Sequence, residues 1–427
     1  MNEPIEPDRP DAEASPEGPS EGEIADISPQ SPKSRWAALE VLWVALRLGL
    51  TSFGGPIAHL GYFREEYVVQ RRWLDETSYA DVVALCQFLP GPASSQVGIA
   101  VGYIRSGMAG GLAAWIGFTL PSALALVLFA YGVEEFDVID AGWLHGLKLA
   151  AVAVVAQAVW GMGRSLALDR DRATIVIVAA VAALAWQSAI MQVLIILVSG
   201  FVGWKILKVD AVQSSKDSLS TFIPKWMGIV ALVVFFVILA GLPLARQLES
   251  SQTLAIFDSF FRSGSLVFGG GHVVLPLLQS EVVGPGWMTN AEFVAGYGAT
   301  QAVPGPLFTF SAYLGAVISP GPQGIVGGGL ALVAIFLPSF LLITGVLPFW
   351  DLLRRRDVFR RALNGVNAAV VGLLLAALYN PVWTSAVETP EDFALAISAL
   401  GLLMFWKTPP WMVVSLAAGG GAAIAYT

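Results

Sequence analysis

Long apolar stretches alternate with short charged ones along the chain from Trp36 onward. Several of these stretches reach the roughly 20 residues that an α-helix needs to cross a lipid bilayer. The pattern predicts an all-α, polytopic integral membrane protein. Two short spans are expected within residues 173–207, with a turn near Gln187.

Two of the apolar stretches contain a Pro-Gly-Pro sequence, and each follows an earlier stretch with a glycine-rich interruption. Proline removes a backbone donor and its ring clashes with the preceding helical turn, so each sequence predicts a helix, a break and another helix. At membrane depth such a break survives only where protein or a watery cavity surrounds it. The prolines expected to break the helices are Pro56, Pro90, Pro92, Pro304 and Pro306.

The breaks belong to a longer match between the two halves of the chain. The matched residues occur in the same order and at similar spacing, which indicates an internal duplication. The clearest pairs are Arg47 with Arg262, Glu66 with Glu281, Trp73 with Trp287, Gly91 with Gly305, and Pro121 with Pro338.

The distribution of Lys and Arg predicts how the halves lie in the membrane. The first repeat has Arg64, Arg71 and Arg72 in the loop after its first broken segment, whereas residues 277–291 contain no Lys or Arg. The acidic loop of the first repeat instead corresponds to the arginine-rich Arg354–Arg361. Since Lys and Arg favour the cytoplasmic side, the repeats are expected to have inverted topology. Whether each broken segment crosses the membrane or re-enters stays open, and the positions of Arg64, Arg71 and Arg72 favour re-entrant hairpins.

This organisation divides the chain into five parts. They are a disordered acidic tail at 1–35, the first repeat at 36–164, linker spans with a polar loop at 165–256, the inverted second repeat at 257–383, and C-terminal spans at 384–427.

Composition agrees with a membrane protein. Of the 427 residues, 56% are hydrophobic and only 13% charged, against roughly 25% charged in soluble proteins. Most of the net charge of −8 belongs to the first 35 residues, which contain nine acids and three bases. We expect this tail in the cytoplasm and no nucleic-acid partner. The single cysteine, Cys86, excludes an internal disulfide, and no metal or cofactor is expected.

Inverted repeats with broken helices are typical of secondary transporters, whose site lies between the repeats. The N-terminus of a half-helix presents unpaired N–H groups and a partial positive charge, which attracts oxyanions. Neutral side chains nearby add donors, and intramembrane arginines would neutralise a dianion. The expected substrate-binding residues are Gly54, Gly55, Gln87, Gly91, Ser94, Ser95, Gln96, Gly269, Gly270, Gln301, Gly305, Arg47 and Arg262.

Four other residues are candidates for carrying a proton, namely Glu66, Glu281, His59 and His272. Histidine titrates near neutral pH, and a carboxylate near the membrane can exchange a proton with the medium. Purely structural roles are the alternative interpretation for these residues. Glycine and proline also serve close helix packing, and the histidines and carboxylates also occur as packed or solvated groups.

Several motifs resemble the signatures of the chromate ion transporter family. They are Phe53–His59, Leu89–Pro92, Phe118–Ser122 and Phe268–Pro276, and the resemblance covers both repeats. The motifs resemble those of the long-chain, two-domain members of the family. This resemblance implies a protein of the bacterial inner membrane. The resemblance further implies export of chromate from the cytoplasm, driven by the proton-motive force, with resistance to chromate as the result.

The sequence therefore predicts a secondary transporter for chromate, a tetrahedral oxyanion, rather than an enzyme. Its expected partners are chromate, protons and the lipid bilayer, while transport of sulfate and a homodimeric assembly stay open. One alternative is an importer of sulfate or another oxyanion. Others are a channel without gradient coupling and an intramembrane chromate reductase, although the chain has neither a nucleotide-binding fingerprint nor a haem attachment motif.

Overall fold

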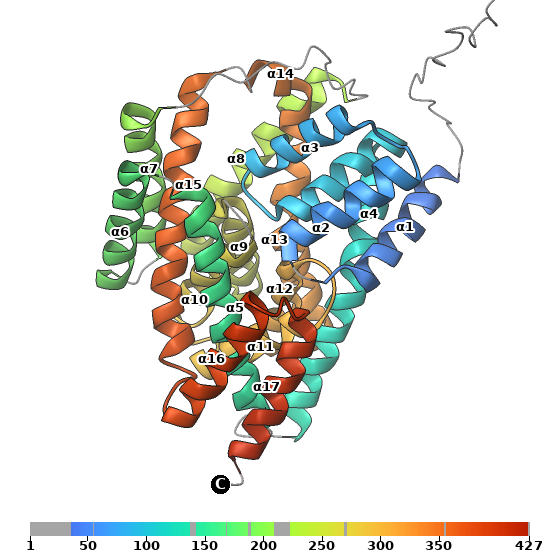
Figure 1. Cartoon of the computed structure of the whole chain (residues 1–427). Coiled ribbons are helices and arrows are strands. Elements are labelled where there is room, and N and C mark those ends of the chain that lie inside the picture. Colours follow the sequence, from blue (N-terminus) through green and yellow to red (C-terminus); the bar gives the residue numbers. More distant parts are fainter. Residues whose placement is uncertain are drawn as a thin grey trace, which may run out of the picture. The chain divides into compact units, whose positions relative to one another are not determined.

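All regular elements in the described part of the chain are helices, which confirms the predicted all-α class (Figure 1). The acidic tail, residues 1–35, lies outside that part, and so do the glycines at 54 and 269–270. The computed structural model describes residues 36–53, 55–136, 142–167, 169–186, 189–208, 223–268, 271–353 and 356–425.

The first repeat consists of three short helices followed by two long ones. Both expected breaks are present, because one helix ends before Gly55 and another ends before Pro90. A third break, at Ser106 and Gly107, separates a short first part of α4 from its long second part. The helices are α1 (Ala37–Thr51), α2 (Gly55–Arg64) with the π-helical extension Glu65–Gln70, α3 (Glu76–Phe88), α4 (Ala93–Phe136) and α5 (Gly142–Leu166).

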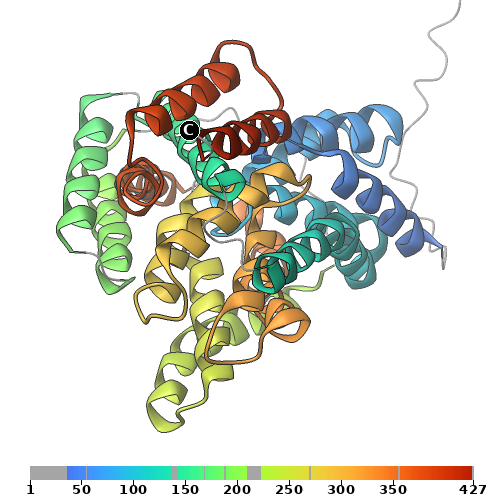
Figure 2. The same cartoon turned by 90° about the horizontal axis from the view of Figure 1, so that it is seen from below.

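The described residues of the linker region form three helices. Two helices, α6 (Arg170–Ala185) and α7 (Ala189–Ile206), lie where the two short spans are expected, and α8 (Lys225–Leu248) follows. Helices α6 and α7 pack against α15, on the side away from α1 (Figures 1 and 2).

The second repeat again begins with short helices, and its Pro-Gly-Pro sequence separates α11 from a 3₁₀ turn that leads into α12. Its elements are α9 (Gln252–Leu266), the 3₁₀ turn Gly271–Val273, α10 (Val274–Val282), α11 (Asn290–Ala302), the 3₁₀ turn Leu307–Thr309, α12 (Phe310–Val317), α13 (Gly324–Val346), α14 (Trp350–Leu353) and α15 (Asp357–Ala377). Two C-terminal helices follow, α16 (Pro390–Met404) and α17 (Pro410–Ile424).

Within the described residues, five helical segments are long and apolar enough to cross a membrane, which confirms a polytopic membrane protein. The remaining helices are shorter, and several of them meet at the breaks. The five segments are Ala93–Gly132, Gly142–Arg164, Lys225–Leu248, Gly324–Phe349 and Asp357–Trp383.

The helices that lead into the loops at 90–92 and 304–306 both start with a side-chain cap. The Asp75 carboxylate accepts from the Ser78 N–H at the start of α3, and this bond holds the pKa of Asp75 below its ordinary value. Thr289 and Glu292 form a capping box at the start of α11. Such caps satisfy backbone donors that the first helical turn leaves unpaired. They therefore define where both helices begin.

Matched glycines bring helices into close contact in both halves. An added Cβ at Gly49 in α1 would lie 2.7 Å from the Phe118 carbonyl oxygen of α4. Gly264 in α9 faces the backbone of Ile335 in α13 at similarly close range. Small residues permit this approach of membrane helices, which gain stability by packing. The duplication and its inverted topology nevertheless stay predictions.

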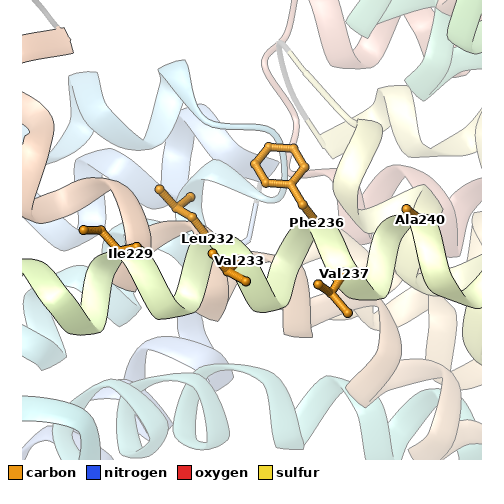
Figure 3. A pocket seen from close by; sticks show the side chains of 6 residues that line it. All are labelled: Ile229, Leu232, Val233, Phe236, Val237 and Ala240. Carbon is orange, nitrogen blue, oxygen red and sulfur yellow. The ribbon is translucent and has the colours of Figure 1, made fainter.

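The outward face of α8 is apolar along most of its length. Six of its side chains line a shallow groove without polar lining (Figure 3). Phe236 and Val237 are more than half exposed. This face suits contact with acyl chains, because lipid tails are as apolar as the side chains themselves. The six residues are Ile229, Leu232, Val233, Phe236, Val237 and Ala240.

We expect Gly264→Ala to lower the thermal stability of the purified protein, because the new Cβ would collide with the backbone of Ile335. Overpacking of this kind costs about 1–3 kcal/mol. Gly329→Ala on α13 is the matched control, since nothing lies within 4 Å of the position of its Cβ. Unfolding midpoints measured in detergent compare the two variants. Equal midpoints would contradict the close contact.

Candidate functional site

The two Pro-Gly-Pro loops at the helix breaks, 90–92 and 304–306, each bond to the opposite half of the chain. The Gly91 N–H donates to the Val267 carbonyl at 2.6 Å, and the Gly305 N–H donates to the Ser52 carbonyl at 2.9 Å. Val267 follows the end of α9, and Ser52 follows the end of α1. The sequence match that aligns Gly91 with Gly305 also aligns Ser52 with Val267. The two halves thus exchange equivalent backbone hydrogen bonds at their breaks.

Only glycine fits at the centre of either loop. Gly91 has φ of +123° and Gly305 has φ of +99°, in the region that side-chain-bearing residues avoid. A Cβ at Gly91 would also lie 2.9 Å from Ser339 Oγ, and one at Gly305 would lie 2.9 Å from Ser122 Oγ. Each serine comes from the long helix of the opposite half and directly follows a matched proline. The contacts of the two loops therefore correspond as well.

A small cavity of about 30 Å³ lies beside the second loop. Its wall includes Gly55 at the start of α2, His272 in the turn before α10, and Gln301 near the end of α11. A cavity of this size holds one or two water molecules. The site is therefore closed to a larger ligand in this conformation. The full lining is Gly55, His272, Thr300, Gln301, Val303, Gly305, Leu307 and Pro410.

The first loop is followed by a buried polar cluster at the start of α4. Ser94, Ser95 and Gln96 are all at most 3% exposed. Gln96 donates from Nε2 to the Pro90 carbonyl at 2.6 Å, and His59 Nδ1 lies 3.3 Å from Ser94 Oγ. The N-terminus of α4, with its unpaired N–H groups and partial positive charge, thus lies among neutral hydrogen-bonding side chains.

Several buried polar atoms around the two loops have no hydrogen-bond partner within the described ranges. Buried polar groups are normally satisfied, so such a cluster indicates a place for water or an ion. The atoms are Ser52 Oγ, His59 Nε2, Ser95 Oγ, Gln96 Oε1 and Gln301 Nε2. They come from both halves of the chain and from the segments that the exchanged hydrogen bonds join.

The matched arginines pair with the matched glutamates. Arg262 makes two hydrogen bonds to Glu281, both at 2.8 Å, whereas Arg47 lies 3.7 Å from Glu66. The Arg47 side chain is 60% exposed and the Arg262 side chain only 22%. Glu66 has a closer partner in Arg71, at 2.8 Å. The Arg47 guanidinium is thus the less constrained of the two.

Arg262 also belongs to a buried charged cluster that includes an unpredicted residue. Its Nε donates at 3.0 Å to Asp258, whose side chain is 1% exposed and which also accepts from Arg246 of α8. The sequence contained one sign of this pair, because Asp258 precedes Arg262 by one helical turn in an apolar stretch. Arg246 comes from a different helix, and only the fold brings it to Asp258.

The structure brings together part of the set that the sequence predicts. Gly55, Gln301, Gly305 and His272 line one cavity, and Gly91, Ser94, Ser95, Gln96 and His59 form the neighbouring cluster. Gln87 is exposed on α3 and does not line the cavity, although its counterpart Gln301 does. Gly54, Gly269 and Gly270 lie outside the described residues.

The sequence did not single out Thr300 or Pro410, which also line the cavity. Thr300 directly precedes Gln301 and was overlooked beside it. Pro410 starts α17, outside both repeats, so nothing in the pattern of the repeats indicated it.

A family model described as chromate transporter matches residues 39–204 and 254–423 of this chain. The chain belongs to the chromate transporter family. Each matched segment of this chromate transporter family member contains one of the two helix-breaking loops, at 90–92 or 304–306, and one of the two arginine–glutamate pairs. No solved structure matches the chain.

Relatives of this family member match over most of their length. A chromate transport protein of Pseudomonas aeruginosa is 31% identical over 389 residues, 88% of this chain and 89% of that protein. An uncharacterized transporter of Methanocaldococcus jannaschii is 27% identical, covering 80% and 83% of the two chains. A probable chromate transport protein of Synechococcus elongatus is 26% identical, covering 85% and 94%.

For this member of the family we expect Arg262→Gln to destabilise the fold far more than Arg47→Gln. The first change leaves Glu281 and the buried Asp258 short of a cation, which costs about 3–5 kcal/mol. The second removes an exposed, long ion pair worth about 0–1 kcal/mol. Equilibrium unfolding in mixed detergent micelles measures both free energies. Similar losses for the two variants would show that the pairs are equivalent.

Proposed function

We propose that this protein is a secondary transporter that exports chromate from the cytoplasm and so confers resistance to it. The observation that carries the proposal is the group of buried, unpartnered polar atoms where the broken helices of the two halves meet. The names of the relatives in Pseudomonas and Synechococcus supply the substrate.

The chemistry of this place suits a tetrahedral oxyanion. Helix N-termini attract anions through unpaired N–H groups and the helix dipole. Serine hydroxyls and the Gln301 amide add donors without adding charge. A site of neutral donors binds a dianion and still releases it, as a transporter requires. Arg47, the less constrained arginine, then attracts the anion to the protein from outside the buried site.

The closed cavity supports alternating access. An oxyanion of five heavy atoms needs more room than one or two waters, so the site must open before it is loaded. In a transporter with inverted repeats, one repeat moves against the other around a fixed site. The exchanged bonds from Gly91 and Gly305 lie at the boundary that such a movement would change.

We place the protein in the bacterial inner membrane, with its N-terminus in the cytoplasm, and infer that the proton-motive force drives export. The candidates for the proton carrier are Glu66 and Glu281, in the matched ion pairs, and His59 and His272 near the loops. Protonation of a paired glutamate would release its arginine, which links proton binding to the charge near the site.

Everted membrane vesicles that contain the protein should accumulate radioactive chromate when they are energised. Accumulation inside everted vesicles corresponds to export from the cell, and a protonophore should abolish it. Excess sulfate should compete, since both anions are tetrahedral dianions. Accumulation of sulfate alone, or none at all, would reject the proposed function. A loss of total chromate from the suspension would indicate a reductase instead.

Gly91→Leu and Gly305→Leu should each abolish this transport while the protein still inserts into the membrane. Leucine cannot adopt the positive φ without strain, and its side chain would fill the space beside Ser339 or Ser122. Gly241→Leu on α8 is the control, because nothing lies within 4 Å of its Cβ position. Protein amounts in the membrane fraction report insertion. Wild-type flux from both loop variants would remove the broken helices from the site.

A further inference from the structure

His272, in the wall of the cavity beside the second loop, belongs to a hydrogen-bonded pair that has no counterpart at the matching positions of the first repeat. His272 Nδ1 lies 2.6 Å from the hydroxyl oxygen of Tyr297, which is fully buried in α11. In the alignment that pairs Gly91 with Gly305, Tyr297 corresponds to Val83. We propose that Tyr297 is a positioning residue that makes His272 a neutral hydrogen-bond donor to the transported oxyanion. This inference rests on the proposed function.

The other ring nitrogen of His272 faces the place where the anion would lie. A Cβ built on Gly55 would stand 3.9 Å from His272 Nε2, so Nε2 points toward the start of α2 in the opposite half. Gln301, whose Nε2 has no partner within the described ranges, lines the same cavity. His272 Nε2 and Gln301 Nε2 therefore share a cavity that also includes the N-terminus of a helix.

The tyrosine determines which nitrogen carries the proton. A neutral imidazole has one donor and one acceptor nitrogen, and the partner of one nitrogen decides the state of the other. Within the described residues, His272 is the sole hydrogen-bond partner of the Tyr297 hydroxyl. If Nδ1 carried the proton, the buried hydroxyl hydrogen would have no acceptor, which is unfavourable. Tyr297 therefore donates to Nδ1, and the proton resides on Nε2.

This tautomer gives the cavity a donor, whereas the other would present a lone pair to the anion. A lone pair repels an oxyanion, so the orientation of one hydroxyl changes the affinity of the site. Apolar packing holds the hydroxyl in place, because the Tyr297 ring meets Phe310 edge to face at 5.7 Å. His272 thus acts here as a fixed donor rather than as the carrier of the coupled proton.

The test measures the chromate concentration for half-maximal uptake into everted vesicles. Tyr297→Phe should raise that concentration about tenfold, as expected for loss of one bond to a charged ligand, and leave the maximal rate nearly unchanged. Tyr313→Phe is the control, since it removes another buried hydroxyl, one that donates to the Glu292 carbonyl away from the cavity. It should behave as the wild type.

A double variant separates positioning from a general structural effect. Without the imidazole there is no tautomer to select, so Tyr297→Phe should have no further effect in a His272→Ala background. An independent tenfold increase in that background would overturn the proposal. His272→Gln should also retain more affinity than His272→Asn, because the Gln amide nitrogen reaches the position of Nε2 and the Asn amide that of Nδ1. The reverse order would overturn it as well.

The outcomes distinguish this inference from the function on which it rests. If the wild type accumulates no chromate, the proposed function fails and the role of Tyr297 fails with it. If the wild type accumulates chromate and Tyr297→Phe does so with the same half-maximal concentration, only the role of Tyr297 fails.

Discussion

The exchange of backbone hydrogen bonds between the two halves is the constraint on which the rest of the site depends. A helix broken inside a membrane leaves N–H and C=O groups that lipid cannot satisfy. Here the loop of each half satisfies a carbonyl at the break of the other, through Gly91 and Gly305. Neither break pairs all of its backbone groups with partners from its own half alone. The segments that carry the donors of the site are consequently held together by the same bonds that make the breaks tolerable.

The buried carboxylates also connect separate segments of the chain. The carboxylates of Glu66 and Asp258 are nearly buried, and each is matched by arginines from more than one segment. Desolvation makes an unpaired charge costly, so such pairs hold helices in a defined arrangement rather than add much net stability. The two halves differ in how completely they are paired. Arg47 is consequently more exposed and less constrained than Arg262.

Much of the fold was accessible from the sequence because its signals are local. Proline and glycine at 90–92 and 304–306 act on their own backbone, so the two breaks could be located to within a residue or two. The pairing of Arg262 with Asp258 had only a weak signal in the sequence. The contact between Asp258 and Arg246 had none, because it depends on how α8 packs against α9 in the fold. Gln87 shows the limit of arguing from a repeat. Its counterpart lines the cavity, but Gln87 itself points outward, because side-chain direction depends on packing that the pattern does not contain.

The cavity wall also includes Pro410, the first residue of α17, which lies outside both repeats. Trp411, the next residue, packs its ring against Phe53 at the break between α1 and α2, with the ring centroids 6.2 Å apart. An assembly of two identical copies of one repeat would lack the part of the cavity wall that α17 provides. Unlike a symmetric dimer of half-length proteins, this chain lines its cavity with a residue from outside the two matched halves. A change in α17 alone would therefore alter the wall of this cavity without altering either of the two matched halves.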